Sequence, residues 1–317
     1  MDYISLSEKV FKNEKRFVSR AISIIESGNS ESAQLLSLLH KRTGNSYRIG
    51  ITGPPGAGKS TLTNQLTKQF RKDNLKVGII AVDPTSPFTG GALLGDRVRM
   101  SEIGSDEGVF IRSMATRGSL GGLSKKTIDA ADVLDAAGYD VIIFETVGVG
   151  QSELDIAKAA DTTIVVLVPE SGDAIQAMKA GLMEIADMFV VNKSDRPGSE
   201  NAITSLNTIL MMREHNAESW LPPIVKAVAS ENKGINDIIN EIQRHREYLE
   251  STNLILKKRE ANSKSRIKEI VYDIIASEIW NRKNEEDLED SVSDVVTGKL
   301  SPYNLANQII NNFKSNL

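Results

Sequence analysis

A phosphate-binding pattern near the start of the chain constrains its fold more than any other feature. Residues 53–60 match the pattern G-x-x-x-x-G-K-[ST] at every fixed position. An apolar stretch at 47–52 precedes the pattern, and apolar residues at helical spacing follow it from Leu62 to Phe70. Strand, glycine-rich loop and helix are the context in which this pattern forms a loop around phosphates. The predicted loop comprises Gly53, Pro54, Pro55, Gly56, Ala57, Gly58, Lys59, Ser60 and Thr61.

The chemistry of such a loop follows from its backbone. Successive N–H groups, together with the positive end of the new helix, form a cradle for an anion. Glycines let the backbone approach a phosphate closely. We expect Lys59 to bring its charge to the β- and γ-phosphates and Ser60 to offer its hydroxyl to Mg²⁺. The sequence therefore predicts a nucleoside triphosphate site rather than a Gly/Pro-rich turn without a ligand.

The composition of the chain excludes several classes of protein. With 317 residues and a net charge of −4, it lacks the basic excess of a general nucleic-acid binder. It has no cysteine, which excludes disulfides and thiolate metal sites. The first 15 residues mix acidic and basic side chains, and the longest apolar run, Ile164–Val168, is too short to cross a bilayer. We therefore expect a soluble cytoplasmic protein that binds neither nucleic acid nor membrane.

Strand-like and helix-like segments alternate through the middle of the chain. This alternation predicts an α/β fold with a mostly parallel sheet and helices on both of its faces. Loops that follow the carboxyl ends of the strands then converge on one ligand site. A flexible loop is predicted at 114–122. The predicted strands are 47–52, 76–82, 109–112, 140–144, 162–168, 188–191 and 223–228.

Helices are predicted before the nucleotide-binding domain. Residues 1–45 form an N-terminal helical segment with one apolar stripe from Val10 to Ile25, which ends at Gly28. The simplest interpretation is that these helices cover one face of the sheet. The nucleotide-binding domain itself is expected at 46–250.

A second helical region is predicted at 251–317, where the alternation stops. It begins with a long helix of mixed charge at 254–280, continues through a charged turn at 281–290 and ends in a helix at 304–313. A long mixed-charge helix is either a solvated packing arm or a dimerisation arm. We expect this region to form a homodimer.

A second motif identifies the base of the nucleotide. An apolar strand leads into N-K-x-D, formed by Asn192, Lys193 and Asp195. A carboxylate at Asp195 can accept two hydrogen bonds from N1–H and the 2-amino group of guanine, a donor pair that adenine lacks. Asn192 would brace the loop, and the alkyl stem of Lys193 can lie against the ring. After the last strand, Ala229 and Ser230 lie where a backbone N–H could reach the guanine O6. The phosphate loop and the N-K-x-D motif together favour GTP over ATP.

Acidic residues at the ends of strands are candidates for holding Mg²⁺, which prefers hard oxygen ligands. Asp83, Asp96 and Glu145 are the candidates, together with the Ser60 hydroxyl. Glu145 occupies the place of the Asp in a D-x-x-G loop, and Gly148 supplies the glycine whose N–H would meet the γ-phosphate. Asp83 would orient the attacking water or hold a metal-bound one. Asp96 could instead be a helix N-terminal acid that interacts with the helix dipole.

Arginines lie in the glycine-bracketed loops beside these acids. One of them could stabilise charge in the transition state of phosphoryl transfer, or all could be ordinary surface side chains. The sequence does not single one out. The candidates are Arg97, Arg99, Arg112 and Arg117.

Taken together, these motifs resemble the MeaB/ArgK-type GTPases, the G-proteins that accompany methylmalonyl-CoA mutase and belong to the SIMIBI class of P-loop GTPases. The resemblance covers nearly the whole chain. Its most specific parts are the motif with Glu145 in place of the usual Asp and the run G-G-A-L-L-G-D-R. The segments that carry it are 53–61, 82–87, 90–97, 117–122, 145–153 and 192–195.

The resemblance implies a homodimeric GTPase chaperone. Such proteins bind an adenosylcobalamin-dependent acyl-CoA mutase, use GTP to gate cofactor loading, and protect and reactivate the mutase. A loop at 169–181 would be a switch that faces this partner, with Glu170, Asp173 and Lys179 as its charged residues. Alternatively, this segment simply connects a strand to a helix. In place of the Ser that many GTPases have before Ala229, this chain has Val228.

Two other functions are compatible with a phosphate-binding loop. A metallochaperone GTPase needs soft ligands, but the chain offers no Cys and only His40, His215 and His245. An ATP-dependent kinase of a periplasmic transport system would transfer the γ-phosphate to a protein, and the guanine motif disfavours ATP. A mutase chaperone with GTPase activity remains the leading prediction.

Overall fold

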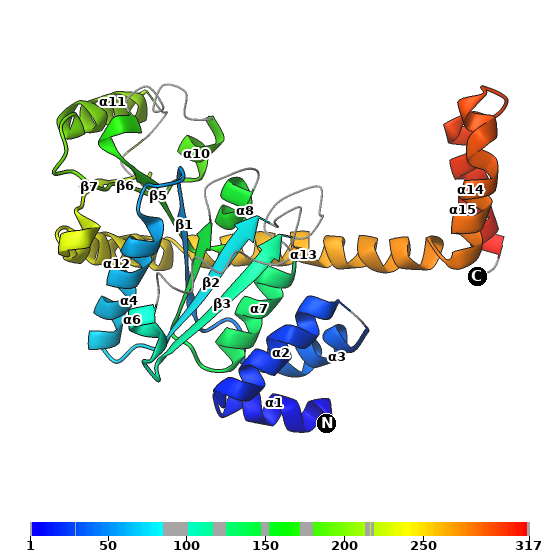
Figure 1. Cartoon of the computed structure of the whole chain (residues 1–317), viewed down its shortest axis with the longest axis horizontal. Coiled ribbons are helices and arrows are strands. Elements are labelled where there is room, and N and C mark those ends of the chain that lie inside the picture. Colours follow the sequence, from blue (N-terminus) through cyan, green and yellow to red (C-terminus); the bar gives the residue numbers. More distant parts are fainter. Residues whose placement is uncertain are drawn as a thin grey trace. The chain divides into compact units, whose positions relative to one another are not determined.

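The computed structural model describes residues 2–28, 30–84, 101–116, 125–146, 152–171, 180–212, 216 and 219–315. Within these ranges, the side chains of residues 30, 31, 83, 84, 101, 115, 116, 152–154, 171 and 180 are not described. The chain divides into two compact units, residues 1–255 and 256–317, which are considered separately (Figure 1).

The first unit is built on a seven-stranded sheet in the order β3-β2-β4-β1-β5-β6-β7. Every strand pairs in parallel with its neighbours, which confirms the predicted parallel sheet. Because β1 lies at the centre, its carboxyl end is flanked by those of β4 and β5. The strands are β1 (Tyr47–Thr52), β2 (Val77–Pro84), β3 (Val109–Thr116), β4 (Val141–Thr146), β5 (Thr162–Leu167), β6 (Met188–Val191) and β7 (Ile224–Lys226).

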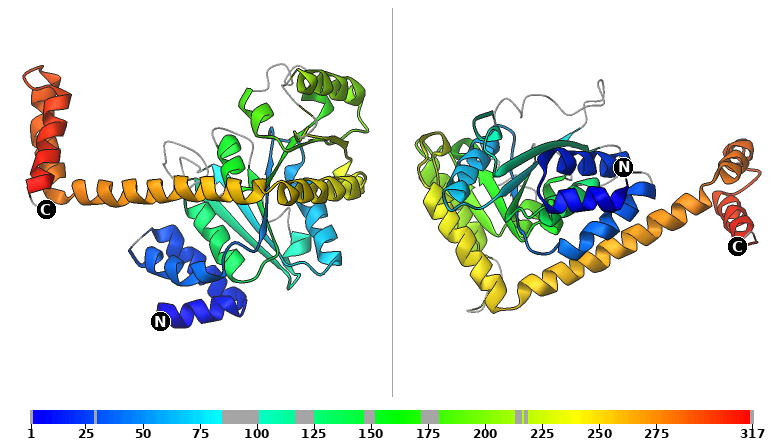
Figure 2. Two further views of the ribbon diagram at one scale, coloured as in Figure 1. Left: turned by 180° about the vertical axis from the view of Figure 1, so that it is seen from behind. Right: turned by 90° about the horizontal axis from the view of Figure 1, so that it is seen from below.

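Helices cover both faces of this sheet because successive strand residues point to opposite sides. Ile143 packs with α4 (Lys59–Lys72) and α12 (Ile235–Ser251) on one face. Ile142 and Phe144 pack with the N-terminal helices and α7 (Lys125–Ala136) on the other. Figures 1 and 2 show α7 beside the N-terminal helices. The remaining helices of this unit include α6 (Ser101–Gly104), α8 (Ser152–Ala159), α10 (Ala180–Ile185) and α11 (Ser199–Met211).

The N-terminal segment contains three α-helices, and the apolar residues predicted as one stripe from Val10 to Ile25 lie on two of them and pack into one core. Helix α1 (Tyr3–Phe11) ends before Asn13, whose φ of 56° is left-handed, and α2 (Lys15–Ser27) begins just after it. Asparagine tolerates this conformation better than most residues, so it can separate two helices. Gly28 ends α2 as predicted, and α3 (Ser30–Leu39) and a short 3-10 helix, η1 (His40–Arg42), complete the segment.

Strand β3 is longer than the sequence predicts. It extends to Thr116, so the first residues of the predicted loop at 114–122 form strand instead. The reason is pairing with β2, which continues in register as far as Pro84 opposite Thr116. Met114 is buried among the apolar residues of the face that α7 covers. This pairing brings the carboxyl ends of β2 and β3 to the same edge as the phosphate-binding loop.

The second unit consists of helices. Helix α13 (Leu254–Ile279) confirms the predicted long helix, and α14 (Arg282–Val296) and α15 (Pro302–Ser315) form a hairpin after it. The predicted charged turn at 281–290 is wrong, because this stretch starts α14. The Asn281 side chain caps the helix by accepting a hydrogen bond from the Asn284 N–H at 3.1 Å. Among the described helices of the chain, none combines the length and apolar character that a membrane span needs.

Candidate phosphate and guanine site

The phosphate-binding loop follows β1 and ends where α4 begins at Lys59. Gly58 precedes the helix with a φ of 88°, and as a glycine it offers no side chain to cap the first turn. Glycine is required at two positions. A Cβ on Gly53 would lie 2.1 Å from the Val166 carbonyl oxygen, and one on Gly58 would lie 2.4 Å from Asn192 Nδ2. The loop therefore packs closely against the ends of β5 and β6.

Lys59 lies within this loop and is only 6% exposed. Its Nζ donates hydrogen bonds to the carbonyl oxygens of Gly53 at 2.8 Å and Pro54 at 2.9 Å. These bonds hold the ammonium group over the loop. A cation at this position can interact with an anion in the loop.

Ser60 and Glu145 meet beside Lys59. The Ser60 hydroxyl donates to Glu145 Oε1 at 2.5 Å, and Glu145 is 5% exposed. Glu145 lies near the end of β4, in register with Ile51 on β1 and Ala81 on β2. The sheet therefore brings together two residues that are 85 positions apart in the sequence.

Asn192 connects three loops. Its Nδ2 donates to the Ala57 carbonyl oxygen at 2.8 Å, and its Oδ1 accepts from the Ala229 N–H at 3.0 Å. The side chain is 3% exposed, and both of its polar ends are used. The Ala229 N–H is therefore engaged by Asn192, whereas the neighbouring Ser230 is exposed. The loops after β1, β6 and β7 form one connected structure.

Asp195 lies in a turn that follows β6. The Arg196 N–H donates to the Lys193 carbonyl oxygen at 3.0 Å, which closes a four-residue turn around Ser194 and Asp195. Lys193 has a left-handed φ of 57°, and its Nζ donates to the Gly56 carbonyl oxygen at 2.7 Å. The Ser194 N–H donates to the Ala227 carbonyl oxygen at 3.0 Å. The Asp195 side chain is exposed at the tip of this turn.

Two further predicted residues take part in contacts that the sequence did not reveal. Glu170 lies in the short 3-10 helix η2 (Pro169–Ser171) after β5, and its Oε1 lies 2.6 Å from Arg196 Nη1. The hydrogen bond from Arg196 lowers the pKa of Glu170. Arg112, a candidate for transition-state stabilisation, instead forms an ion pair with Glu26 on α2. Arg196 was not a candidate, because a loop arginine carries no pattern that distinguishes it from a surface residue.

Several predicted residues are not placed by the structure. Asp83 continues β2, where its backbone pairs in register with Ala115, but its side chain is not described. Others lie outside the described residues altogether. These are Asp96, Arg97, Arg99, Arg117, Gly148, Asp173 and Lys179.

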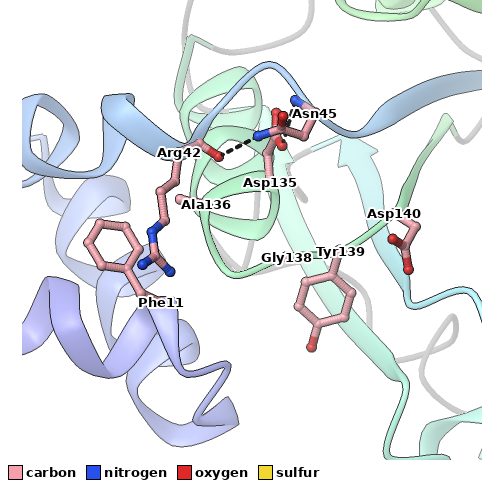
Figure 3. A pocket seen from close by; sticks show the side chains of 8 residues that line it. All are labelled: Phe11, Arg42, Asn45, Asp135, Ala136, Gly138, Tyr139 and Asp140. Atoms are coloured by element: carbon pink, nitrogen blue, oxygen red, sulfur yellow. Dashed lines mark hydrogen bonds between the residues drawn. The ribbon is translucent and has the colours of Figure 1, made fainter.

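A hollow of about 210 Å³ lies at the opposite edge of the sheet. Figure 3 shows the Arg42 side chain beside Phe11, and the guanidinium carbon lies 4.3 Å from the ring centroid. Buried Asp135 accepts hydrogen bonds from the N–H groups of Gly44 at 2.7 Å and Ser46 at 3.0 Å. These contacts hold the segment before β1. The hollow lies near the amino ends of β1 and β4, away from the phosphate-binding loop.

A second polar cluster lies at this amino edge. The Thr162 hydroxyl contacts the Tyr47 hydroxyl at 2.5 Å and His245 Nδ1 at 2.8 Å. His245 Nε2 lies 3.5 Å from Asp187 Oδ1, and the Trp220 ring covers the imidazole with centroids 4.7 Å apart. Burial raises the pKa of Tyr47. Among the described residues, no three His, Asp or Glu side chains gather as a metal cluster.

Known proteins are similar to this sequence over nearly its whole length. A family model described as methylmalonyl Co-A mutase-associated GTPase MeaB matches residues 18–284. A protein of Pyrococcus abyssi that is named as a GTPase is 48% identical over 307 residues, which cover 96% of this chain and 95% of that protein. A Mus musculus protein named methylmalonic aciduria type A homolog, mitochondrial, is 29% identical over 323 residues and matches 96% of this chain and 78% of that one.

The fold has a solved counterpart. A crystal structure of a protein named LAO/AO transport system kinase superposes with a TM-score of 0.72 and 26% sequence identity. The superposition covers 98% of this chain and 97% of that one. The likeness therefore includes both the sheet unit and the helical C-terminal unit.

Proposed function

This chain belongs to the family of methylmalonyl-CoA mutase-associated GTPases described by the MeaB model, and from this premise we propose that it acts as a GTP-dependent chaperone of an adenosylcobalamin-dependent acyl-CoA mutase. The observation that carries the nucleotide part of this proposal is Asn192. Its side chain joins the phosphate-binding loop to the guanine motif through bonds of 2.8 Å and 3.0 Å. Phosphate and base recognition would thus be connected through this side chain.

At the phosphate end, we propose that the loop from Gly53 to Thr61 holds the β- and γ-phosphates of GTP. Lys59 Nζ would exchange the carbonyl oxygens of Gly53 and Pro54 for phosphate oxygens, which are stronger acceptors because they are charged. The N–H groups of the first turn of α4 would add the partial positive charge of the helix end. Binding at this end requires no rearrangement of the sheet.

The residues beside Lys59 fit Mg²⁺. The Ser60 hydroxyl and the Glu145 carboxylate are hard oxygen donors already 2.5 Å apart, which is the donor type that this ion prefers. When bound, the ion would neutralise charge that develops on the phosphates. We propose that Asp83 and Asp96 complete its environment, with Asp83 orienting the attacking water. Gly148 would direct its N–H to the γ-phosphate.

At the base end, we propose that Asp195 accepts hydrogen bonds from N1–H and the 2-amino group of guanine. Charge-assisted bonds of this type contribute about 1.5–3 kcal/mol each, so they dominate the choice between guanine and adenine. The Lys193 stem would lie against the base, and Ala229 and Ser230 would line its O6 edge. The exposed carboxylate at the tip of the turn supports this role.

A partner of the mutase class is supported by the family description and by the name of the mouse relative. We propose that the loop at 169–181 reports the bound nucleotide to this partner through Glu170, Asp173 and Lys179. Affinity-tagged protein can be loaded with GTP or GDP and mixed with purified methylmalonyl-CoA mutase. Capture that depends on the nucleotide is expected. Absent capture in both states would contradict this partner, and equal capture in both states would contradict the nucleotide-dependent switch.

A second experiment separates the chaperone from a kinase of a transport system, the role that the name of the solved counterpart gives to that protein. The chaperone hydrolyses GTP and leaves no phosphate on protein. Incubation with radiolabelled ATP and a periplasmic binding protein is therefore expected to label nothing. Transfer of label from ATP to that protein would favour the kinase.

We also propose that the second unit forms a homodimer. Helix α13 exposes apolar side chains at helical spacing, including Ile267, Ile270, Val271 and Ile274. An unpaired apolar stripe of this kind favours burial against a second copy. Sedimentation should give a dimer for the wild type and a monomer for Ile274→Asp, with Lys264→Asp on the same helix as the control. A monomeric wild type would contradict the proposal.

A further inference from the structure

We propose that Arg196 and Glu170 position the carboxylate that reads guanine, and that they link this carboxylate to the chain segment after β5. Arg196 would be the positioning residue and Glu170 its anchor. The proposal rests on the role of Asp195 proposed above and adds the means by which its turn is held. Neither residue is expected to touch the reacting phosphate.

The turn that carries Asp195 is held at both of its ends. Lys193, its first residue, reaches the phosphate-binding loop through the bond from Nζ to the Gly56 carbonyl oxygen at 2.7 Å. Arg196, its last residue, reaches in another direction to Glu170 Oε1 at 2.6 Å. Because Asp195 lies between the two anchors, the geometry of its carboxylate depends on both.

The second anchor is part of a packed contact between two segments. Glu170 lies in η2, which follows β5, and α11 begins three residues after Arg196. Gly198, at the start of α11, lies against η2, since a Cβ there would be 3.9 Å from the Pro169 carbonyl oxygen, an ordinary van der Waals contact. The ion pair therefore connects segments that already lie side by side at the base end of the site.

Arg196 also balances the charge of two carboxylates. Its pKa is raised, chiefly by the hydrogen bond and charge of Glu170 and to a smaller extent by the charge of Asp195. Removing the guanidinium would leave two negative groups near one turn. Repulsion between them would displace the turn from the position that Lys193 and Arg196 now define.

The ion pair of Arg196 and Glu170 is exposed enough to break when its segments move. Arg196 and Glu170 side chains are about half exposed, at 48% and 52%, and exposed ion pairs hold only weakly. A partner that moves η2 would therefore release one end of the Asp195 turn and weaken guanine binding. By thermodynamic linkage, guanine nucleotide bound at Asp195 would in turn strengthen the position of η2. The pair thus couples base recognition to the first residues of the proposed partner switch.

The test measures dissociation constants for GDP and for IDP, whose base lacks the 2-amino group that Asp195 would read. Glu170→Gln and Arg196→Gln should each weaken GDP binding by about two- to five-fold, the range that an exposed ion pair can reach. The affinity of these variants for IDP should fall less than their affinity for GDP, because IDP offers Asp195 one donor instead of two. The dissociation constant of the double variant for GDP should be no higher than the higher of the two single-variant values. Arg196→Lys should bind GDP within about two-fold of wild type because it keeps the charge.

Glu200→Gln is the matched control. It removes the exposed ion pair between Glu200, in the first turn of α11, and Lys226 at the end of β7. It should leave both dissociation constants unchanged. Unchanged constants in Glu170→Gln and Arg196→Gln, additive losses in the double variant, or an equal loss in Glu200→Gln would overturn the inference. A wild-type protein that binds GDP no better than ADP would instead contradict the proposed function.

Discussion

The two edges of the sheet use similar polar residues in different ways. At the carboxyl edge, Lys59, Asn192 and Lys193 each donate a hydrogen bond to a backbone carbonyl of the phosphate-binding loop. At the amino edge, Thr162 and His245 bond to other buried side chains. The first arrangement ties side chains to the loop that we propose holds the phosphates. The second ties β1, β5 and α12 to one another.

This contrast indicates how to distinguish a binding site from a structural network. A buried polar side chain is costly unless it is hydrogen-bonded, so both edges must satisfy their polar groups. At the carboxyl edge the acceptors belong to the loop that would contact the ligand. At the amino edge the polar groups are locked between β1, β5 and α12. Substitutions at the two edges should therefore separate activity from stability.

The largest expected effect is the loss of hydrolysis in Lys59→Ala. This change removes the charge that the proposed mechanism brings from the loop to the β- and γ-phosphates, so kcat for GTP should fall by at least about a hundred- to a thousand-fold. Phosphate release under saturating GTP measures it. Lys68→Ala is the control, because Lys68 lies on the same helix and pairs with exposed Glu102. Turnover in Lys59→Ala near that of wild type would contradict the mechanism.

Glu145→Gln should have the next largest effect. The amide keeps the shape of the side chain but removes the charge that meets the Ser60 hydroxyl. The Mg²⁺ concentration for half-maximal hydrolysis should rise by about ten-fold or more, which corresponds to one charge-assisted interaction. Titration of activity with Mg²⁺ measures the shift. An unchanged titration curve would mean that Glu145 has no role in holding the ion.

A substitution at the amino edge should lower stability and leave nucleotide binding nearly unchanged. His245→Ala removes a buried side chain and leaves Thr162 with one partner fewer, so the free energy of unfolding should fall by about 2–3 kcal/mol. GTP affinity of the folded protein should stay within about two-fold of wild type, since additivity is expected between distant sites. Chemical denaturation and nucleotide titration measure the two quantities. His40→Ala, at an exposed histidine, is the control and should change neither.

The sequence predicts which loops meet at the carboxyl edge because their residues carry patterns. The spacing of glycines and Lys59 predicts the phosphate loop, and N-K-x-D after a strand predicts the base loop. Alternation of strands and helices is enough to predict that both loops reach the same edge of a parallel sheet. The predicted meeting of Ser60 and Glu145 follows from that topology, and the structure places them 2.5 Å apart.

Other features depend on single contacts that no periodicity reveals. The break between α1 and α2 depends on one left-handed residue, Asn13, in the polar stretch between the apolar residues of the two helices. Helix α14 starts where the charged composition suggests a turn, because the Asn281 side chain caps it. The ion pair of Arg196 with Glu170 joins residues 26 positions apart, on segments brought together only by the fold. Such features are set by tertiary contacts rather than by local sequence.

The most direct test of the account measures the affinities of the wild type and Asp195→Asn for GTP and XTP. Xanthine carries an oxygen where guanine carries the 2-amino group, so an amide at position 195 can donate to it while a carboxylate cannot. Wild type should prefer GTP, and Asp195→Asn should lose GTP affinity by about ten-fold or more and gain affinity for XTP. A variant that keeps the wild-type preference for GTP would contradict the central claim that the turn after β6 reads guanine.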